Sequence, residues 1–143
     1  MGKRVSDVMM PEVSSVSPGT TAREATRMMR DADAGSLPVV EGERVVGIVT
    51  DRDIALRVVG EGKSADTPVG EIATGDVVSV RPEQDLDEAL RVMARYQVRR
   101  LPVVEPDGRL VGIFAQADVA FEAGPTKAGE VVEEISEPPQ THD

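Results

Sequence analysis

The sequence predicts an α+β fold made of two copies of one unit, each with the order strand, helix, strand, strand, helix. A repeat is the first observation, because Leu37-Pro38-Val39-Val40-Glu41 returns as Leu101-Pro102-Val103-Val104-Glu105, 101 minus 37 or 64 residues later. Short apolar runs typical of strands alternate with stretches of helical period, which is the second observation. Length is the third, since 143 residues suit one compact domain or two half-domains that share a core.

The repeat covers the chain from about residue 5 to residue 121. Its equivalent pairs include Val13 with Val77, Val16 with Val80, Pro18 with Pro82, Met29 with Met93 and Asp53 with Asp118. The last pair is 118 minus 53 or 65 residues apart, because the second copy has one extra residue in a turn. We therefore expect repeat 1 with an N-terminal arm over residues 1–62, repeat 2 with its linker over 63–122, and a tail over 123–143.

Each repeat is expected to open with a short strand and a helix. The strands are predicted over residues 13–16 and 77–80, with Pro18 and Pro82 in the turns that follow. Thr21-x-x-Glu24 and Asp85-x-x-Glu88 have the spacing of capping boxes or near variants, which predicts where the helices begin. One face of the second helix is predicted to be core, and it consists of Leu86, Ala89, Leu90, Met93 and Tyr96.

A hairpin and a closing helix are expected to complete each repeat. The hairpin turns are predicted at Glu41-Gly42-Glu43 and Glu105-Pro106-Asp107-Gly108. Closing helices are expected over residues 51–59 and 116–122, and the Gly-rich residues 60–64 are read as a linker. Ile54, Leu56 and Val58 offer more apolar surface than one side of a small core covers, which predicts a homodimer.

Composition excludes several classes of protein. A net charge of -10 disfavours nucleic acid and anionic membranes as partners, because their negatively charged phosphates repel an acidic protein. The chain has no Cys, which excludes disulfides and thiolate metal sites. Apolar runs are too short to span a bilayer and the N-terminus has no apolar signal region, so we expect a soluble, cytoplasmic protein. The acidic, Pro-containing tail over residues 123–143 is expected to be mostly disordered.

Chemistry is expected where the second hairpin strand meets the closing helix, in Gly47-Ile48-Val49-Thr50-Asp51-Arg52-Asp53. Thr50 is a good helix N-cap and Asp53 follows three residues later, so their oxygens and the N–H groups of the first turn converge. One interpretation is a variant capping box that only begins a helix. The other is a hydroxyl and a carboxylate that also bind the sugar of a ligand. These seven residues alone leave both alternatives open.

The same segment, with Leu-Pro-Val-Val before the hairpin and the unit present twice, resembles the tandem cystathionine-beta-synthase (CBS) domain pair. The resemblance covers nearly the whole chain before the tail. It implies an α/β-like α+β fold, in which two β-α-β-β-α repeats pack as a pseudo-two-fold pair. It also implies a stand-alone regulatory module that requires no cofactor and binds AMP, ADP, ATP or S-adenosylmethionine between the repeats.

The resemblance further implies roles for particular residues. Thr50 and Asp53 would hold the ribose, as an ionised carboxylate accepts from two vicinal hydroxyls. The phosphates would meet basic residues before Leu-Pro of repeat 2 and on the first turn of the closing helix, which here are Arg99, Arg100 and Arg52. The adenine would lie against strand edges, where the candidates are Val13, Val77, Val78 and Ile48.

The second cleft departs from this pattern. Ala115 stands where repeat 1 has the hydroxyl residue, so Asp118 lacks its companion. Gly35 and Ser36 stand where repeat 2 has its arginines. The second site is therefore expected to be weaker or empty.

Nothing in the sequence predicts catalysis. The sole histidine, His142, is next to the terminal residue, and neither a Gly-rich phosphate loop nor a carboxylate cluster with metal-ligand spacing is present. The leading prediction is thus a non-catalytic, adenine-nucleotide-binding regulatory module without a metal. The alternative is a ligand-free structural module that dimerises and engages an unknown protein partner.

Overall fold

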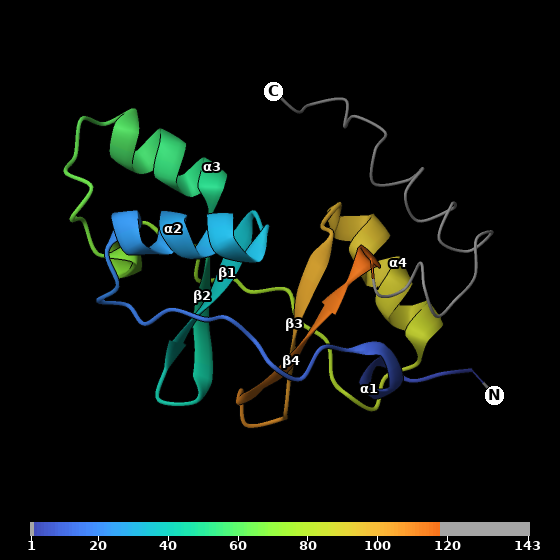
Figure 1. Ribbon diagram of the computed structural model, residues 1–143. Coiled ribbons are helices and arrows are strands. Elements are labelled where there is room, and N and C mark those ends of the chain that lie inside the picture. Colours follow the sequence, from blue (N-terminus) through green and yellow to red (C-terminus); the bar gives the residue numbers. More distant parts are fainter. Residues whose placement is uncertain (1, 118–143) are drawn as a thin grey trace. The chain divides into compact units, whose positions relative to one another are not determined.

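The computed structural model describes residues 2–117, which form two compact units (Figure 1). The repeat-1 unit consists of Val13–Val78 and Pro106–Leu110. The repeat-2 unit consists of the residues before Val13, Ser79–Glu105, and the described residues from Val111 onward. Helices and two-stranded antiparallel hairpins in these units confirm the α+β class. The segment that precedes each repeat belongs to the unit of the other repeat, and the predicted tail lies outside the described residues.

The repeat-1 unit is a hairpin with helices before and after it. Its elements are α2 (Ala22–Ala32), β1 (Ser36–Glu41), β2 (Arg44–Thr50), α3 (Asp51–Ile54), the π-helix η1 (Ala55–Val59) and the 3-10 helix η2 (Val69–Glu71). β1 and β2 pair antiparallel, with Leu37 opposite Val49 and Val39 opposite Gly47. The predicted hairpin is therefore confirmed, and α3 with η1 spans the residues expected for the closing helix.

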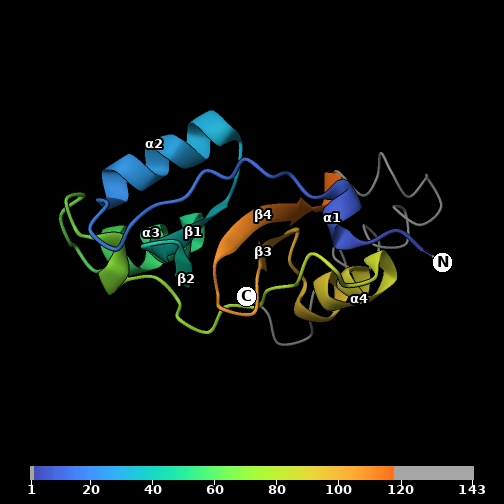
Figure 2. The ribbon, with the colours of Figure 1, turned by 90° about the horizontal axis from the view of Figure 1, so that it is seen from below.

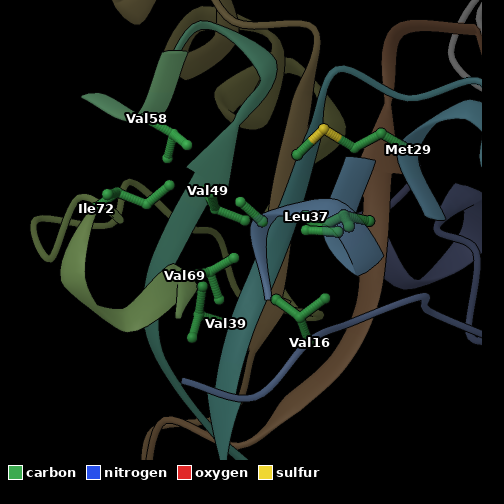
Figure 3. Packing of buried hydrophobic residues seen from close by; sticks show 10 residues of the cluster. Val16, Met29, Leu37, Val39, Val49, Val58, Val69 and Ile72 are labelled. Carbon is green, nitrogen blue, oxygen red and sulfur yellow. The ribbon is translucent and has the colours of Figure 1, made fainter. Parts of the chain in front are cut away.

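The core of the repeat-1 unit gathers between α2, the hairpin and the helices after it (Figure 3). Leu37, Val39 and Val49 come from the hairpin and are each at most 1% exposed. Val58 of η1 is buried in this cluster, and Ile54 packs against it. The prediction that Val58 is a surface residue is therefore wrong, because the helix turns this side chain toward the hairpin. Full burial of a Val stabilises the fold by about 1.5–3 kcal/mol.

The opening strands predicted over residues 13–16 and 77–80 are shorter than expected. Only Val16 and Val80 pair, each as a single parallel bridge, with Val39 and Val103 respectively. The backbone N–H of Val16 donates to the Pro38 carbonyl, and the Val40 N–H donates to the Val16 carbonyl. The next donor in each parallel ladder would be the residue two positions on, which is Pro18 or Pro82. Since proline has no N–H, the ladder ends there.

The repeat-2 unit is built in the same way, with a short helix added from the N-terminal arm. Its elements are α1 (Val5–Val8), α4 (Leu86–Tyr96), β3 (Arg100–Val104) and β4 (Leu110–Ala115). Figure 2 shows α1 beside β4 and α4, and Met10 pairs with Ile113 at the edge of β4. Of the predicted second closing helix, only Gln116 and Ala117 are described.

The predicted core face of α4 is confirmed except at its end. Leu86, Ala89, Leu90 and Met93 are all buried. Tyr96 is 49% exposed, so its assignment to the core is wrong. Tyr96 is the last residue of α4, and Gln97 turns into the left-handed conformation directly after it, which leads the chain away.

The two helix starts differ in how they are capped. At α2 the Thr21 hydroxyl accepts from the Glu24 N–H, and the Thr21 N–H donates to Glu24, so the predicted box is complete. That backbone hydrogen bond and the Thr21 hydroxyl lower the pKa of Glu24 below its ordinary value of 4.5. Asp85 makes no side-chain cap at α4, contrary to prediction. There the Lys3 carbonyl accepts the Leu86 N–H, and Gln84 donates to Glu88 instead.

Two equivalent glycines let the exchanged segments approach the hairpins. A Cβ at Gly47 would lie 2.9 Å from the Thr74 carbonyl oxygen, and one at Gly112 would lie 2.9 Å from that of Met10. Thr74 and Met10 pair antiparallel with the residues that follow these glycines, Ile48 and Ile113. The glycine of each Gly-Ile dipeptide is therefore required by packing against a segment from outside that repeat.

Candidate functional site

Thr50 and Asp53 form a complete capping box at the start of α3. The Thr50 hydroxyl accepts a hydrogen bond from the Asp53 N–H at 2.9 Å, and Asp53 Oδ2 accepts one from the Thr50 N–H at 2.9 Å. β2 ends at Thr50 in extended conformation, which places the hydroxyl over the first helical turn. The capping interpretation of these residues is therefore confirmed.

Capping does not use all the hydrogen-bonding capacity of the pair. Among the described residues, Asp53 Oδ1 accepts no hydrogen bond, and the Thr50 hydroxyl group donates to no acceptor. Both side chains are half-buried. A carboxylate oxygen and a hydroxyl thus remain side by side where a ligand hydroxyl group could donate to one and accept from the other.

The four apolar candidates for the adenine belong to the same unit as this pair. Val13, Val77, Val78 and Ile48 are all half-buried residues of the repeat-1 unit. Ile48 exchanges two backbone hydrogen bonds of 2.9 Å with Thr74, which fixes the edge of the hairpin. Contact of these side chains with an adenine stays a prediction.

The arginines differ in position and exposure. Arg52 is exposed on the first turn of α3 in the repeat-1 unit. Arg99 is exposed and Arg100 is half-buried at the start of β3, both in the repeat-2 unit. No hydrogen bond or ion pair joins the guanidinium of Arg99 or Arg100 to another part of the chain within residues 2–117. Both cations are thus available to an anion, and their action on the same ligand as Asp53 stays a prediction.

The equivalent position in repeat 2 lacks the hydroxyl, as expected. Ala115 ends β4 and is buried, whereas Asp118 lies outside the described residues. Gln116 holds the place of Asp51, and its side-chain Oε1 is buried without a hydrogen-bond partner among the described residues. The sequence alone did not single out this glutamine, because its buried acceptor depends on the packing around the end of β4.

Sequence reasoning also missed a groove in the repeat-1 unit. Its volume is about 470 Å³, and it is lined by Thr26, Met29, Arg30, Asp33, Ala34, Gly35, Asp51, Ile54, Ala55 and Val59. These residues come from the end of α2, the following loop and the closing helix. Val59 is 73% exposed and Leu56 is 54% exposed. A groove of this kind depends on how two helices pack, which periodicity alone does not give.

The chain matches a known family over both repeats. The family model that describes the CBS domain matches residues 5–60 and again residues 69–123. The CBS domain-containing protein YhcV of Bacillus subtilis is 43% identical over 116 residues, which are 81% of this chain and 82% of YhcV.

The chain belongs to the CBS domain family.

Solved CBS structures have the same fold as this CBS pair. The crystal structure of CBSX2 in complex with AMP has a TM-score of 0.76 and 30% identity, and the match covers 88% of this chain and 99% of CBSX2. The CBS domain pair of MJ0100, in complex with 5-methylthioadenosine and S-adenosyl-L-methionine, has a TM-score of 0.74 and 25% identity. The match covers 85% of this chain and 100% of the MJ0100 domain pair. The predicted fold of tandem CBS repeats is thus confirmed.

Residues 2–117 of the CBS pair contain neither a metal-ligand cluster nor a membrane-spanning helix. No group of three or more His, Cys, Asp or Glu side chains in this range is arranged to hold a metal ion. In the same range, no helix has the length and apolar character needed to cross a membrane.

Proposed function

We propose that this CBS pair is a non-catalytic regulatory module that binds an adenosine-containing ligand. One observation carries the proposal: Thr50 and Asp53 complete a helix cap and still leave a hydroxyl proton and a carboxylate oxygen for a ligand. The structures of CBSX2 with AMP and of MJ0100 with two adenosyl compounds support the ligand class. The ribose is the part that these ligands share.

The helix cap prepares the ribose site before a ligand arrives. Asp53 Oδ2 accepts the Thr50 N–H, so the carboxylate is held at the start of α3 while Oδ1 is not used by the cap. One hydroxyl of a ribose can then donate to Asp53 Oδ1, and the vicinal hydroxyl can accept the Thr50 hydroxyl proton. Because the geometry is already formed, little conformational entropy is lost on binding.

The phosphates of such a ligand are assigned to Arg99 and Arg100, with Arg52 as a further cation. Guanidinium groups bind phosphate oxygens through paired N–H donors, and the protein as a whole carries a net charge of -10. In a chain with this net charge, a phosphate is attracted to places where basic side chains are grouped, as Arg99 and Arg100 are.

A second candidate function rests on the groove and on the exposed Leu56 and Val59 of the closing helix. Apolar side chains gathered on one surface are typical of a face that meets a protein. The groove is lined by charged residues of both signs, which are Arg30, Asp33 and Asp51. A mixed patch can pair with its own copy across a two-fold axis, so we propose a homodimer through this face. This candidate needs no ligand.

Thermal melting with AMP, ADP, ATP, S-adenosylmethionine and NAD tests the first function. A ligand at about 100 times its Kd adds about 2.7 kcal/mol to the free energy of unfolding, which raises the Tm by several degrees. Free adenine and 2′-deoxy-AMP are the matched controls, because they lack the vicinal hydroxyls. Equal Tm values for AMP and its 2′-deoxy analogue would refute the ribose site, and no shift with any compound would favour the ligand-free module.

A further inference from the structure

The two repeats share a backbone junction but differ in the side chains there. The Asp51 N–H donates to the Gly35 carbonyl at 2.9 Å in the repeat-1 unit, and the Gln116 N–H donates to the Arg99 carbonyl at 2.9 Å in the repeat-2 unit. Both bonds join the first residue after the hairpin to the residue just before it. Arg99 therefore stands where Gly35 stands, and Gln116 stands where Asp51 stands.

The repeat-1 junction shows what this geometry does to side chains. A Cβ on Gly35 would lie 3.3 Å from Asp51 Oδ2, which is tighter than an ordinary van der Waals contact. A residue just before the hairpin would therefore have its Cβ in contact with the side chain of the residue just after the hairpin. Because repeat 2 has the same backbone hydrogen bond at this junction, we expect the Cβ of Arg99 to lie beside the side chain of Gln116.

Gln116 presents an acceptor at this place that lacks a donor. Its Oε1 is buried and has no hydrogen-bond partner among the described residues, and a buried acceptor that stays without a donor is unfavourable. The Arg99 guanidinium offers five N–H donors, none of which is given to another group of residues 2–117. Arg99 therefore carries donors of the kind that the Gln116 acceptor lacks.

We propose that Gln116 is the positioning residue for Arg99, with its amide oxygen accepting one guanidinium N–H. The proposal rests on the function proposed above, in which Arg99 binds the phosphate of an adenosyl ligand. An amide orients the guanidinium without neutralising it, so the positive charge and the other N–H groups face the phosphate. An acid at this position, as at Asp51 in repeat 1, would form an internal ion pair and compete with the ligand.

The test measures what the phosphate adds to affinity, as the ratio of the adenosine Kd to the AMP Kd. Gln116→Glu keeps the length of the side chain and adds the competing charge, and we expect this ratio to fall about tenfold while the adenosine Kd is unchanged. Gln116→Asn keeps a neutral amide and should retain most of the ratio. Asp51→Asn is the matched control at the equivalent junction, where Gly35 has no side chain to orient, and should leave the ratio unchanged.

A second readout needs no ligand. The Nε–H resonance of Arg99, identified by its loss in Arg99→Ala, should exchange slowly with solvent in the unaltered protein and about tenfold faster in Gln116→Ala. Equal exchange rates in both proteins, or a ratio that Gln116→Glu leaves unchanged, would overturn the role of Gln116. Absence of AMP binding to the unaltered protein would instead refute the proposed function, and the exchange rates would still decide whether Gln116 holds Arg99.

Discussion

At the scale of single residues, Thr50 and Asp53 cap a helix and are proposed to bind a ligand as well. Asp53 and Thr50 satisfy each other's backbone N–H groups and keep spare oxygens. The sequence showed their spacing but left capping and ligand binding as alternatives, because the same residue types suit both. The structure shows that the two residues cap α3 and that the cap leaves Asp53 Oδ1 and the Thr50 hydroxyl proton unused. The Arg100 guanidinium, by contrast, makes no hydrogen bond or ion pair within residues 2–117.

Replacement of Arg100 separates phosphate recognition from ribose recognition. We expect Arg100→Ala to weaken AMP and ATP about tenfold, because a hydrogen bond to a charged group is worth about 1.5–3 kcal/mol. Adenosine, which has no phosphate, should bind as before. Calorimetric titration of both compounds measures this, and an equal loss for adenosine would mean that Arg100 acts on the fold or the nucleoside instead.

At the scale of elements, most of what periodicity and turn residues predict is present. The hairpins, α2, α4 and the closing helix of repeat 1 lie where their patterns indicate. The wrong predictions concern caps, strand lengths and burial that depend on a segment far away in the chain. The Lys3 carbonyl caps α4 in place of Asp85. The pairing of each opening strand ends at the proline two residues after its bridge. Val58 lies in the hydrophobic core of the repeat-1 unit instead of on the surface. None of these effects is visible in a local pattern, since each depends on a partner far away in the chain.

The capping box of α2 predicts a pH dependence of stability. The pKa of Glu24 is lowered in the folded chain by the Thr21 N–H, so its contribution is present above the ordinary value of 4.5 and is lost as the pH falls through the lower, folded value. Glu24→Gln should therefore be less stable at pH 7 and should lose less stability on acidification. Urea midpoints at pH 7 and below pH 4.5 measure the difference. Parallel pH curves for both proteins would contradict the assignment.

At the scale of the whole molecule, the repeat could be predicted from sequence and the exchange of segments could not. Each unit takes the segment that precedes the other repeat, and Gly47 and Gly112 make room for these segments. An internal repeat reveals equivalent residues but does not show which copy packs with which segment. The groove beside α3 and the buried acceptor of Gln116 were missed for the same reason, since both depend on packing.

The proposed homodimer predicts that a charge on the exposed face separates the copies without unfolding them. Leu56→Asp should shift the sedimentation coefficient from dimer to monomer at tens of micromolar protein, because burying an unpaired carboxylate is costly. The far-ultraviolet circular dichroism should not change. Val58→Asp is the contrasting variant, since Val58 lies in the core and its replacement should unfold the repeat-1 unit. A monomer already in the unaltered protein would refute this dimer.

Calorimetric titration of AMP into the unaltered protein and into Asp53→Asn tests the central claim most directly. Asparagine keeps an oxygen for the Thr50 N–H, so the free energy of unfolding should change by less than about 1 kcal/mol. The ionised acceptor for the ribose is lost, so AMP should bind about ten- to a hundredfold more weakly, or by about 1.5–3 kcal/mol. Asp118→Asn, in the repeat that lacks the hydroxyl residue, is the control and should bind AMP as the unaltered protein does. Equal affinities for the unaltered protein and Asp53→Asn, or a larger loss at Asp118, would contradict the assignment of the ribose to Asp53.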